Sequence, residues 1–335
     1  MRVVVGLSGG VDSTVAAFLL KRKGFDVVGL HLIIWGDETE RTRGIAGELG
    51  IEFHVRDVRK QFRETIIDYF VESYRAGLTP NPCAFCNRDI KLRFMLEVAD
   101  ELGARFVATG HYLRVKDGVI YRGIDRAKDQ SYFLALVPPH ALRRLLTPLG
   151  ELTKEKVTEI AKDIGVHARV SKESQDVCFL EGTNLVEFLR QHIGDLEGEI
   201  IGPDGKVLGM HKGTHYFTIG QRRKLGVSLG ERVYITAIDP AKRQIHLGYT
   251  ARFRFIKVVN LNWLKRQPDS FRAEVKIRQL HRPAPATVKI FGGTAIVEFD
   301  EPQWAPTPGQ IAAFYIGDML VGGGVIAEYS NSALS

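Results

Sequence analysis

The first strand of the chain and the loop after it have the sequence Val3-Val4-Val5-Gly6-Leu7-Ser8-Gly9-Gly10-Val11-Asp12-Ser13-Thr14. The apolar run predicts a buried strand, and the apolar residues 15–20 predict the helix that follows. Gly9 and Gly10 lack Cβ, so the backbone can bend closely around an anion, and the start of a helix adds unpaired N–H groups. Hydroxyl donors come from Ser8, Ser13 and Thr14. The sequence therefore predicts a phosphate-binding loop between the strand and the helix.

This loop differs from two common nucleotide loops, because no Lys follows its glycines and it lacks the GxGxxG spacing. A plain Gly-Gly turn is the alternative interpretation. The segment Ser8–Ser13 resembles the signature of the ATP pyrophosphatase family, whose members split ATP between the α and β phosphates. The resemblance implies bound ATP with Mg²⁺ near Asp12, and ATP contacts from Gly6, Leu7, Ser8, Gly9, Gly10, Val11, Asp12 and Ser13.

Composition limits the classes of protein that need to be considered. The chain has 335 residues and a net charge of +7. It has neither an apolar run of the roughly 20 residues needed to cross a bilayer nor a signal-peptide pattern, so we expect a cytoplasmic protein without membrane contact. The positive charge favours a polyanionic partner without identifying it. Three cysteines cannot all pair, which favours metal binding or catalysis over a disulfide framework.

The N-terminal half alternates strands with helices. Strands are predicted over residues 26–33, 51–55 and 105–109, helices over 59–76 and 89–103, and a hairpin over 113–122, with helical patterns again over 130–165. This order predicts an α/β fold with a doubly wound parallel sheet, whose ligands bind at the carboxyl ends of the strands. Three segments fall at such ends: the Gly9-Gly10 loop, the stretch after Leu32, and residues 109–112.

The rest of the chain is rich in short strands separated by Gly and Pro turns, typical of small β modules and barrels. We expect a phosphate-binding domain with a helical extension over 1–195, a small β-rich module over 196–255, and a C-terminal β-barrel over 256–335. In the last of these, residues 276–282 alternate cationic and apolar side chains, which predicts a strand with Lys276, Arg278 and Arg282 on one face.

The cysteines form the second informative pattern. Cys83 and Cys86 lie in Thr79-Pro80-Asn81-Pro82-Cys83-Ala84-Phe85-Cys86-Asn87, where the prolines predict an extended loop, and Cys178 follows Asp176-Val177. Three thiols can bind zinc with a fourth ligand, anchor an iron–sulfur cluster with one open iron, or pass sulfur as a persulfide and disulfide. Three inert thiols are the remaining interpretation.

Taken in order, SGGVDS, PNP followed by Cys and Asn, TGHY, KDQSYFL, DVCF and GQR resemble the tRNA-specific 2-thiouridylase family over most of the chain. The resemblance implies that ATP adenylates O2 of the wobble uridine, U34, and that a persulfide supplies sulfur, giving 2-thiouridine, AMP and pyrophosphate. Cys86 would be the nucleophile, Cys178 the persulfide carrier, and Leu32 and Gly110 further ATP contacts. Target-base and tRNA contacts would come from Asn81, Pro82, Cys83, His111, Lys128, Asp129, Gln130, Arg278, Gln279 and Gln310.

One position departs from the family pattern, since Cys83 stands where much of the family has Asp. A thiol with a pKa of ~8.5 cannot take the same acid–base role as a carboxyl with a pKa of ~3.9. The substitution instead gives three soft ligands, Cys83, Cys86 and Cys178, which resembles the iron–sulfur-dependent tRNA thiolases. A [4Fe–4S] cluster and a cluster-free persulfide route are therefore competing hypotheses.

The expected partners are tRNA and a sulfur-donor protein or inorganic sulfide, and a monomer is favoured. The alternatives are another tRNA modifier of this fold, forming 2-thiocytidine or lysidine, and a nucleotide-binding regulator without catalysis. In the regulator the cysteines would need no common role.

Overall fold

The computed structural model describes residues 1–165 and 177–334. Its N-terminal sheet contains β1 (Arg2–Gly6), β2 (Asp26–Ile33), β3 (Glu52–Asp57), β4 (Phe106–Ala108) and β7 (Leu145–Leu146), in the order β3-β2-β1-β4-β7. All neighbours are parallel. The predicted doubly wound sheet is confirmed. The direction of winding changes between β1 and β4, which is where ligands of such sheets bind.

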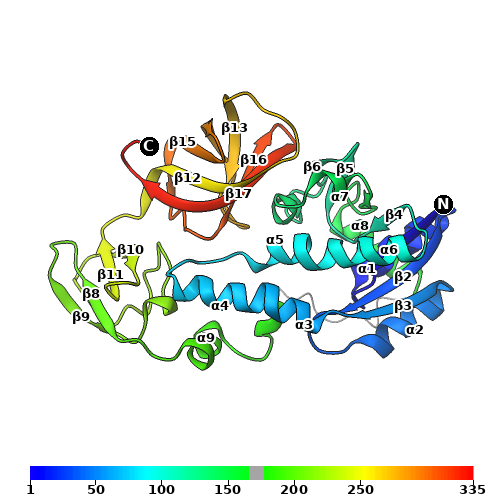
Figure 1. Cartoon of the computed structure of the whole chain (residues 1–335), viewed down its shortest axis with the longest axis horizontal. Helices are drawn as coiled ribbons and strands as arrows, with labels where there is room; N and C mark the ends of the chain where they lie inside the picture. The colour runs from blue at the N-terminus through cyan, green and yellow to red at the C-terminus, as the bar shows by residue number, and fades with distance from the viewer. Residues whose placement is uncertain (166–176, 335) are drawn as a thin grey trace.

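Helices link and cover this sheet. They are α1 (Val11–Arg22), α2 (Thr39–Leu49), α3 (Arg59–Phe62), α4 (Asp68–Arg75), α5 (Pro82–Cys86), α6 (Arg93–Glu101), α7 (Pro139–Leu142), α8 (Lys154–Asp163) and α9 (Leu185–Ile193). A π-helical turn, Arg63–Ile67, joins α3 to α4, and another, Asn87–Leu92, joins α5 to α6. In Figure 1, α4 and α5–α6 run side by side from the sheet toward the middle module.

The prediction of an extended loop around Cys83 and Cys86 is wrong. Both cysteines lie in α5, because Asn81 caps the helix through a 3.2 Å bond from the Ala84 N–H to its Oδ1 and Pro82 fits the first helical turn. The predicted helix at 89–103 therefore begins earlier, at Pro82.

The segment predicted as helical over 130–165 is mostly irregular, with a 3₁₀ turn at Ser131–Leu134 before α7, β7 and α8. The predicted hairpin is confirmed as β5 (Leu113–Lys116) and β6 (Val119–Arg122). Its strand β6 pairs with the last strand of the chain, so the hairpin extends the C-terminal sheet.

The middle module contains β8 (Gly198–Ile201), β9 (Val207–His211), β10 (Tyr234–Asp239) and β11 (Gln244–Gly248), in the order β10-β11-β8-β9. The C-terminal strands are β12 (Arg252–Trp263), β13 (Ser270–Lys276), β14 (Ala284–Phe291), β15 (Thr294–Trp304), β16 (Ile311–Ile316) and β17 (Met319–Ser330). Pairing of β12 with β17 closes them into a barrel around an apolar core. The expected β-rich half is confirmed.

The strand predicted through Arg282 ends at Lys276 instead. The chain turns there, with the His281 N–H donating to the Arg278 carbonyl at 3.1 Å, before Pro283 and Pro285. Lys276 and Arg278 therefore do not share a strand face.

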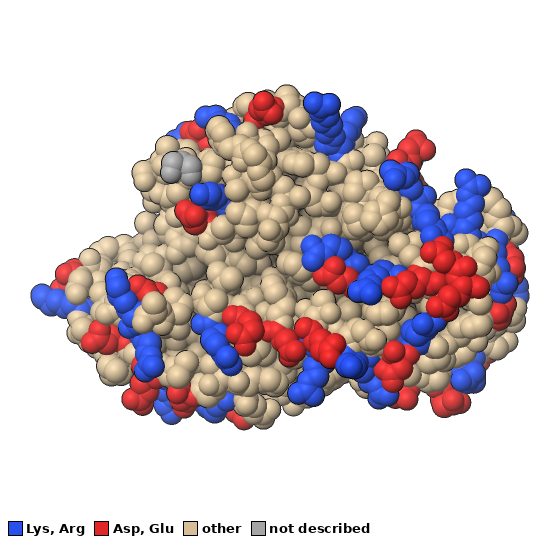
Figure 2. Space-filling model, in the orientation of Figure 1, with Lys and Arg blue, Asp and Glu red and all other residues tan. Residues whose placement is uncertain are grey.

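The surface charge is mixed on the face shown in Figure 2. Basic and acidic side chains interleave along the lower edge, and the area between the barrel and the middle module carries little charge. The net charge of +7 thus does not form one basic patch on this face. None of the helices among residues 1–165 and 177–334 is long and apolar enough to cross a membrane.

Candidate active site

The loop between β1 and α1 has the geometry of an anion cradle. Gly9 has φ +75°, a left-handed conformation that favours glycine, and Gly10 precedes the helix without a side-chain cap. The Ser8 N–H donates to Ser13 Oγ at 3.2 Å, and Ser13 Oγ donates to the Gly10 carbonyl at 3.0 Å. These bonds fix the loop and leave the first N–H groups of α1 without a capping side chain, as phosphate binding requires.

The segment after β4 packs directly against this loop. A Cβ built on Gly110 would lie 2.7 Å from the Asp12 carbonyl carbon, so only glycine allows this approach. Asp12 accepts a hydrogen bond from the Tyr112 hydroxyl at 2.7 Å and pairs with Lys154 Nζ at 2.8 Å. Its carboxylate is therefore engaged by protein groups in this state. The structure brings together the two strand ends on which the sequence analysis relied.

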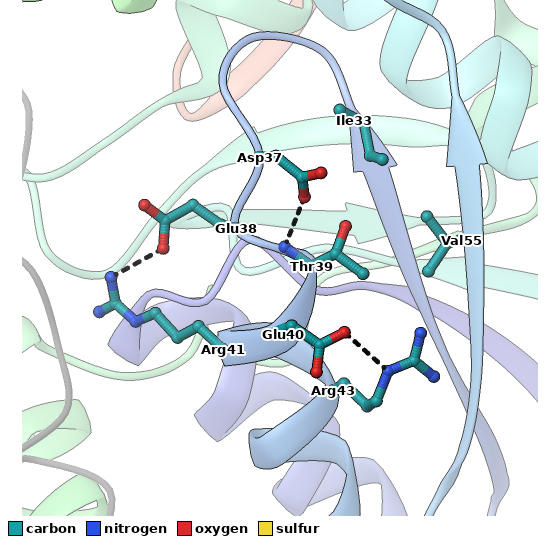
Figure 3. A pocket seen from close by; sticks show the side chains of 8 residues that line it. All are labelled: Ile33, Asp37, Glu38, Thr39, Glu40, Arg41, Arg43 and Val55. Carbon is teal, nitrogen blue, oxygen red and sulfur yellow. Dashed lines mark hydrogen bonds and ion pairs between the residues drawn. The ribbon is translucent and has the colours of Figure 1, made fainter.

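The stretch after Leu32 lies at the same edge of the sheet. His31 Nδ1 lies 3.1 Å from the Leu7 carbonyl and 3.5 Å from Thr42 Oγ1, and both side chains are buried. Beside them is an open pocket of about 610 Å³, which Figure 3 shows between the start of α2 and the ends of β2 and β3. Its lining includes Arg41 and Arg43, which point to opposite sides of α2.

Two of the cysteines lie on α5 and the third approaches from another element. Cys86 is buried, and Cys83, one turn earlier on the same helix, is exposed. Cys178 is also exposed and begins a 3₁₀ turn at residues 178–180. That turn is anchored by Phe179, whose ring packs 5.0 Å from that of Phe70. Asp176, from the DVCF motif, lies outside the described residues.

The three thiols are close enough to interact electrostatically. Burial raises the pKa of Cys86 to about 12, and ionisation of Cys178 or Cys83 would raise it further. Burial also raises the pKa of Cys83 and of Cys178, although both keep exposed surface. In this state all three are protonated at neutral pH.

Lys91 is the cation among these thiols, and the sequence analysis missed it. Burial lowers its pKa, but negative charge on Cys86, Cys83 and Cys178, once these thiols ionise, outweighs burial and raises the pKa of Lys91. In return, Lys91 lowers the pKa of each thiol. An α-helix would place Cys86 and Lys91 about 140° apart around its axis. The π-helical turn at Asn87–Leu92, with its i to i+5 bonding, brings them closer to one face. That turn left no signal in the sequence.

His111 lies next to the segment that packs against the phosphate loop. It follows Gly110, and its Nδ1 lies 2.8 Å from Thr109 Oγ1. Burial and the charge of Lys91 lower its pKa to about 3, so the imidazole is neutral at physiological pH. His111 thus follows a residue that packs on the phosphate loop and lies within reach of the Lys91 charge.

Most of the predicted tRNA contacts have partners inside the protein. Asp129 is buried and accepts from the Gly123 N–H and the Ser131 hydroxyl. Gln130 Oε1 accepts from the Tyr112 N–H at 3.0 Å. Lys128 lies beside them in the turn after Asp125.

Of the predicted tRNA contacts in the barrel, Arg278 and Gln310 are also bonded within the protein. Arg278 is half-buried and donates to the Ala305 carbonyl and to Thr307 Oγ1, and Gln279 has a buried Oε1 without a partner. Gln310 Nε2 donates to the carbonyls of Thr79 at 2.9 Å and Pro80 at 3.2 Å. It therefore contacts the segment that leads into Asn81, Pro82 and Cys83. The tRNA roles of these residues stay predictions.

Within residues 1–165 and 177–334, no three His, Cys, Asp or Glu side chains lie together as a metal-binding group. The cysteines in this arrangement thus do not fit an iron–sulfur cluster, and Asp12 is already paired with Lys154.

Models of known families match nearly the whole chain. A tRNA methyl transferase HUP domain matches residues 1–182, a tRNA methyl transferase PRC-barrel domain 186–249, and an aminomethyltransferase beta-barrel domain 253–326. The tRNA-specific 2-thiouridylase MnmA of Syntrophotalea carbinolica is 42% identical over 345 residues, covering 97% of this chain and 98% of that protein.

The protein of the same name from a Synechococcus species is also 42% identical, with 97% of each chain covered. Among solved structures, a 4-thiouridine synthetase–RNA complex with bound ATP has a TM-score of 0.38 and 20% identity, covering 57% of this chain and 50% of that one. A likeness at that level is too low to say anything of function.

Proposed function

The chain belongs to the family of tRNA-specific 2-thiouridylases, and from this premise we propose that it is an ATP-dependent tRNA-uridine 2-sulfurtransferase acting on the wobble uridine. The observation that carries the proposal is that Cys178 lies close enough to Cys86 and Cys83 for its charge to raise the pKa of both thiols. Cys86 and Cys178 come from distant parts of the chain, and Phe179, the neighbour of Cys178, packs in the same apolar cluster as Cys86. We place the reaction in the cytoplasm.

In the first step the uridine O2 attacks the α phosphorus of ATP, and the bond to the β phosphate breaks. We expect the loop at Ser8–Ser13 to hold the departing pyrophosphate through the first N–H groups of α1, which have no capping side chain. The base must leave its stack to reach the site, as in other enzymes that act on a base. Neutral His111, next to the segment that packs against the loop, is placed to face it.

In the second step sulfur replaces the activated oxygen. The terminal sulfur of a Cys178 persulfide attacks C2, and AMP leaves with the original oxygen. The Cys86 thiolate then attacks Sγ of Cys178, which breaks the S–S bond and leaves the electron pair on the sulfur of 2-thiouridine. A Cys86–Cys178 disulfide remains, which a thiol reductant must open. Lys91 assists because it favours the thiolate form of both cysteines.

The cluster hypothesis has less support than this route, because the described residues do not form its donor set. We infer that Cys83 borders the target base rather than carrying a metal. A protein or sulfide donor that loads Cys178 fits its exposed position. Formation of 2-thiocytidine or lysidine is disfavoured because the relatives of the whole chain are 2-thiouridylases, and the common position of the cysteines argues against a regulator without catalysis.

The test is a reconstituted reaction with unmodified tRNA, ATP, Mg²⁺ and a persulfide source. We expect 2-thiouridine in the nucleoside digest and one AMP per thiolated tRNA. Cys86→Ala and Cys178→Ala should each abolish 2-thiouridine while adenylation of the tRNA, measured as pyrophosphate release, persists. Cys83→Ala is the matched control, since the persulfide route predicts retained thiolation without bound iron. Thiolation that survives loss of both Cys86 and Cys178 would contradict the proposal. Loss of iron together with activity in Cys83→Ala would instead favour the cluster.

A further inference from the structure

Arg41 is a cation from outside the phosphate loop that lies over it. Atoms Cδ and Nε of Arg41 lie 3.7 Å from the position that a Cβ on Gly9 would occupy, and Thr42 Oγ1 lies 3.5 Å from that position. Arg41 and Thr42 therefore face the side of Gly9 on which any other residue would carry its side chain. The helix that carries Arg41 is held against the loop by the contacts of His31 with Leu7 and Thr42.

The loop needs such a cation. Residues 6–14 contain no Lys or Arg, whereas other phosphate loops use a lysine that follows their glycines. Lys154 reaches the loop from α8, but its ammonium is bound to the Asp12 carboxylate. Pyrophosphate leaves with more negative charge than it carries within ATP, so a cation near it should stabilise the transition state.

We propose that Arg41 binds the β and γ phosphates of ATP and the departing pyrophosphate. The proposal rests on the proposed function and adds a residue to its first step. A guanidinium can donate two parallel hydrogen bonds to phosphate oxygens. In the structure, Arg41 Nη1 lies 3.2 Å from Glu38 Oε2, so this carboxylate holds the place that a phosphate oxygen would take.

Arg43 is a matched control on the same helix. It also lines the pocket and also pairs with a glutamate, Glu40, at 3.5 Å. Its guanidinium, however, lies 5.1 Å from the centre of the Phe53 ring and points away from Arg41 (Figure 3). Removing Arg43 should therefore leave phosphate binding unchanged.

The experiment measures binding without tRNA or sulfur, by displacement of a fluorescent non-hydrolysable ATP analogue with pyrophosphate or AMP. Arg41→Ala should weaken pyrophosphate binding about tenfold to hundredfold, the loss expected for a hydrogen bond between charged groups, and leave AMP binding unchanged. Arg41→Lys should recover part of the loss, and Arg43→Ala should match the wild type.

Glu38→Gln separates ligand binding from a structural ion pair. If Glu38 competes with phosphate, this variant should bind pyrophosphate as tightly as the wild type or more tightly. Equal pyrophosphate affinity in Arg41→Ala and Arg43→Ala would overturn the proposal. So would an equal loss for pyrophosphate and AMP, or a Glu38→Gln variant as weak as Arg41→Ala. Failure of the thiolation assay would count against the proposed function, whereas this binding assay judges Arg41 alone.

Discussion

At the scale of single residues, the charge of Lys91 controls how much thiolate Cys86 can form. Burial raises the pKa of Cys86 to about 12 and Lys91 opposes that rise, so removing the charge must raise the pKa further. At a fixed pH below the pKa of a thiol, the fraction present as thiolate falls as that pKa rises. Lys91→Met should therefore slow alkylation of Cys86 several-fold at pH 8 and move the onset of thiolation activity to higher pH.

The measurement is mass-spectrometric detection of iodoacetamide modification at Cys86 across a pH series. Lys91→Arg keeps the charge and should retain most of the reactivity. Arg93→Met is the control on the same helix, since Arg93 is exposed and pairs with Glu97. Equal modification rates for Lys91→Met and the wild type at every pH would show that Lys91 does not act on this thiol.

Two glycines of the nucleotide site should respond differently to a side chain. Gly10 has φ −92°, and a Cβ there would find its nearest neighbour, Ser8 Oγ, at 3.5 Å, so Gly10→Val should fold normally and yet block the phosphates. A Cβ on Gly110 would collide with the backbone of Asp12 and Ser13, so Gly110→Ala should lower both thermal stability and ATP consumption. Thermal melting and AMP release measure the two effects. Wild-type AMP release from Gly10→Val would mean that phosphate does not bind at this loop.

At the scale of elements, a loop of the barrel holds the segment before α5. Besides the two bonds from Gln310, the Thr79 N–H donates to the Pro308 carbonyl at 2.8 Å. Gln310→Ala should release the Thr79 and Pro80 carbonyls and loosen the start of the cysteine helix. We therefore expect slower single-turnover thiolation with unchanged tRNA affinity, measured by quenched reaction and filter binding. A drop in affinity with an unchanged rate would favour direct tRNA contact by Gln310, as the sequence resemblance implies.

The elements that the sequence predicted well have strong local patterns. The predicted strand at residues 26–33 coincides with β2, and the hairpin around Asp117-Gly118 has the expected position, because strand periodicity and turn residues are local signals. The start of α5 was missed because its cap, Asn81, lies between two prolines that favour an extended chain. Lys91 was missed because a π-helical turn brings it toward the face of Cys86. Arg41 was missed because a contact between separate elements, α2 and the phosphate loop, brings it to Gly9.

At the scale of the whole molecule, residues 77–81 contact both β-rich parts. Gly309 of the barrel packs against Thr79, with a Cβ built on it only 3.0 Å from the Thr79 carbonyl, and the Thr79 hydroxyl lies 2.8 Å from that of Thr218 in the middle module. Gly77 lies against Pro240 of that module. The cysteine helix therefore begins at a junction of all three parts (Figure 1). Because of these contacts, a shift of either β-rich part would be transmitted to Cys83 and Cys86.

A pair of glycine variants can test this junction. Gly77 and Gly103 both follow helices with left-handed φ, +73° and +65°, so replacing either by Ala should cost a similar backbone strain of about 1 kcal/mol. Only at Gly77 would the new methyl group meet another part of the molecule, since it would overlap the Pro240 ring, whereas Gly103 has nothing within 4 Å. Gly77→Ala should therefore melt at a lower temperature than Gly103→Ala and thiolate more slowly, with ATP analogue binding unchanged. Equal melting temperatures and equal thiolation rates for the two variants would mean that the middle module does not brace the cysteine helix through this contact.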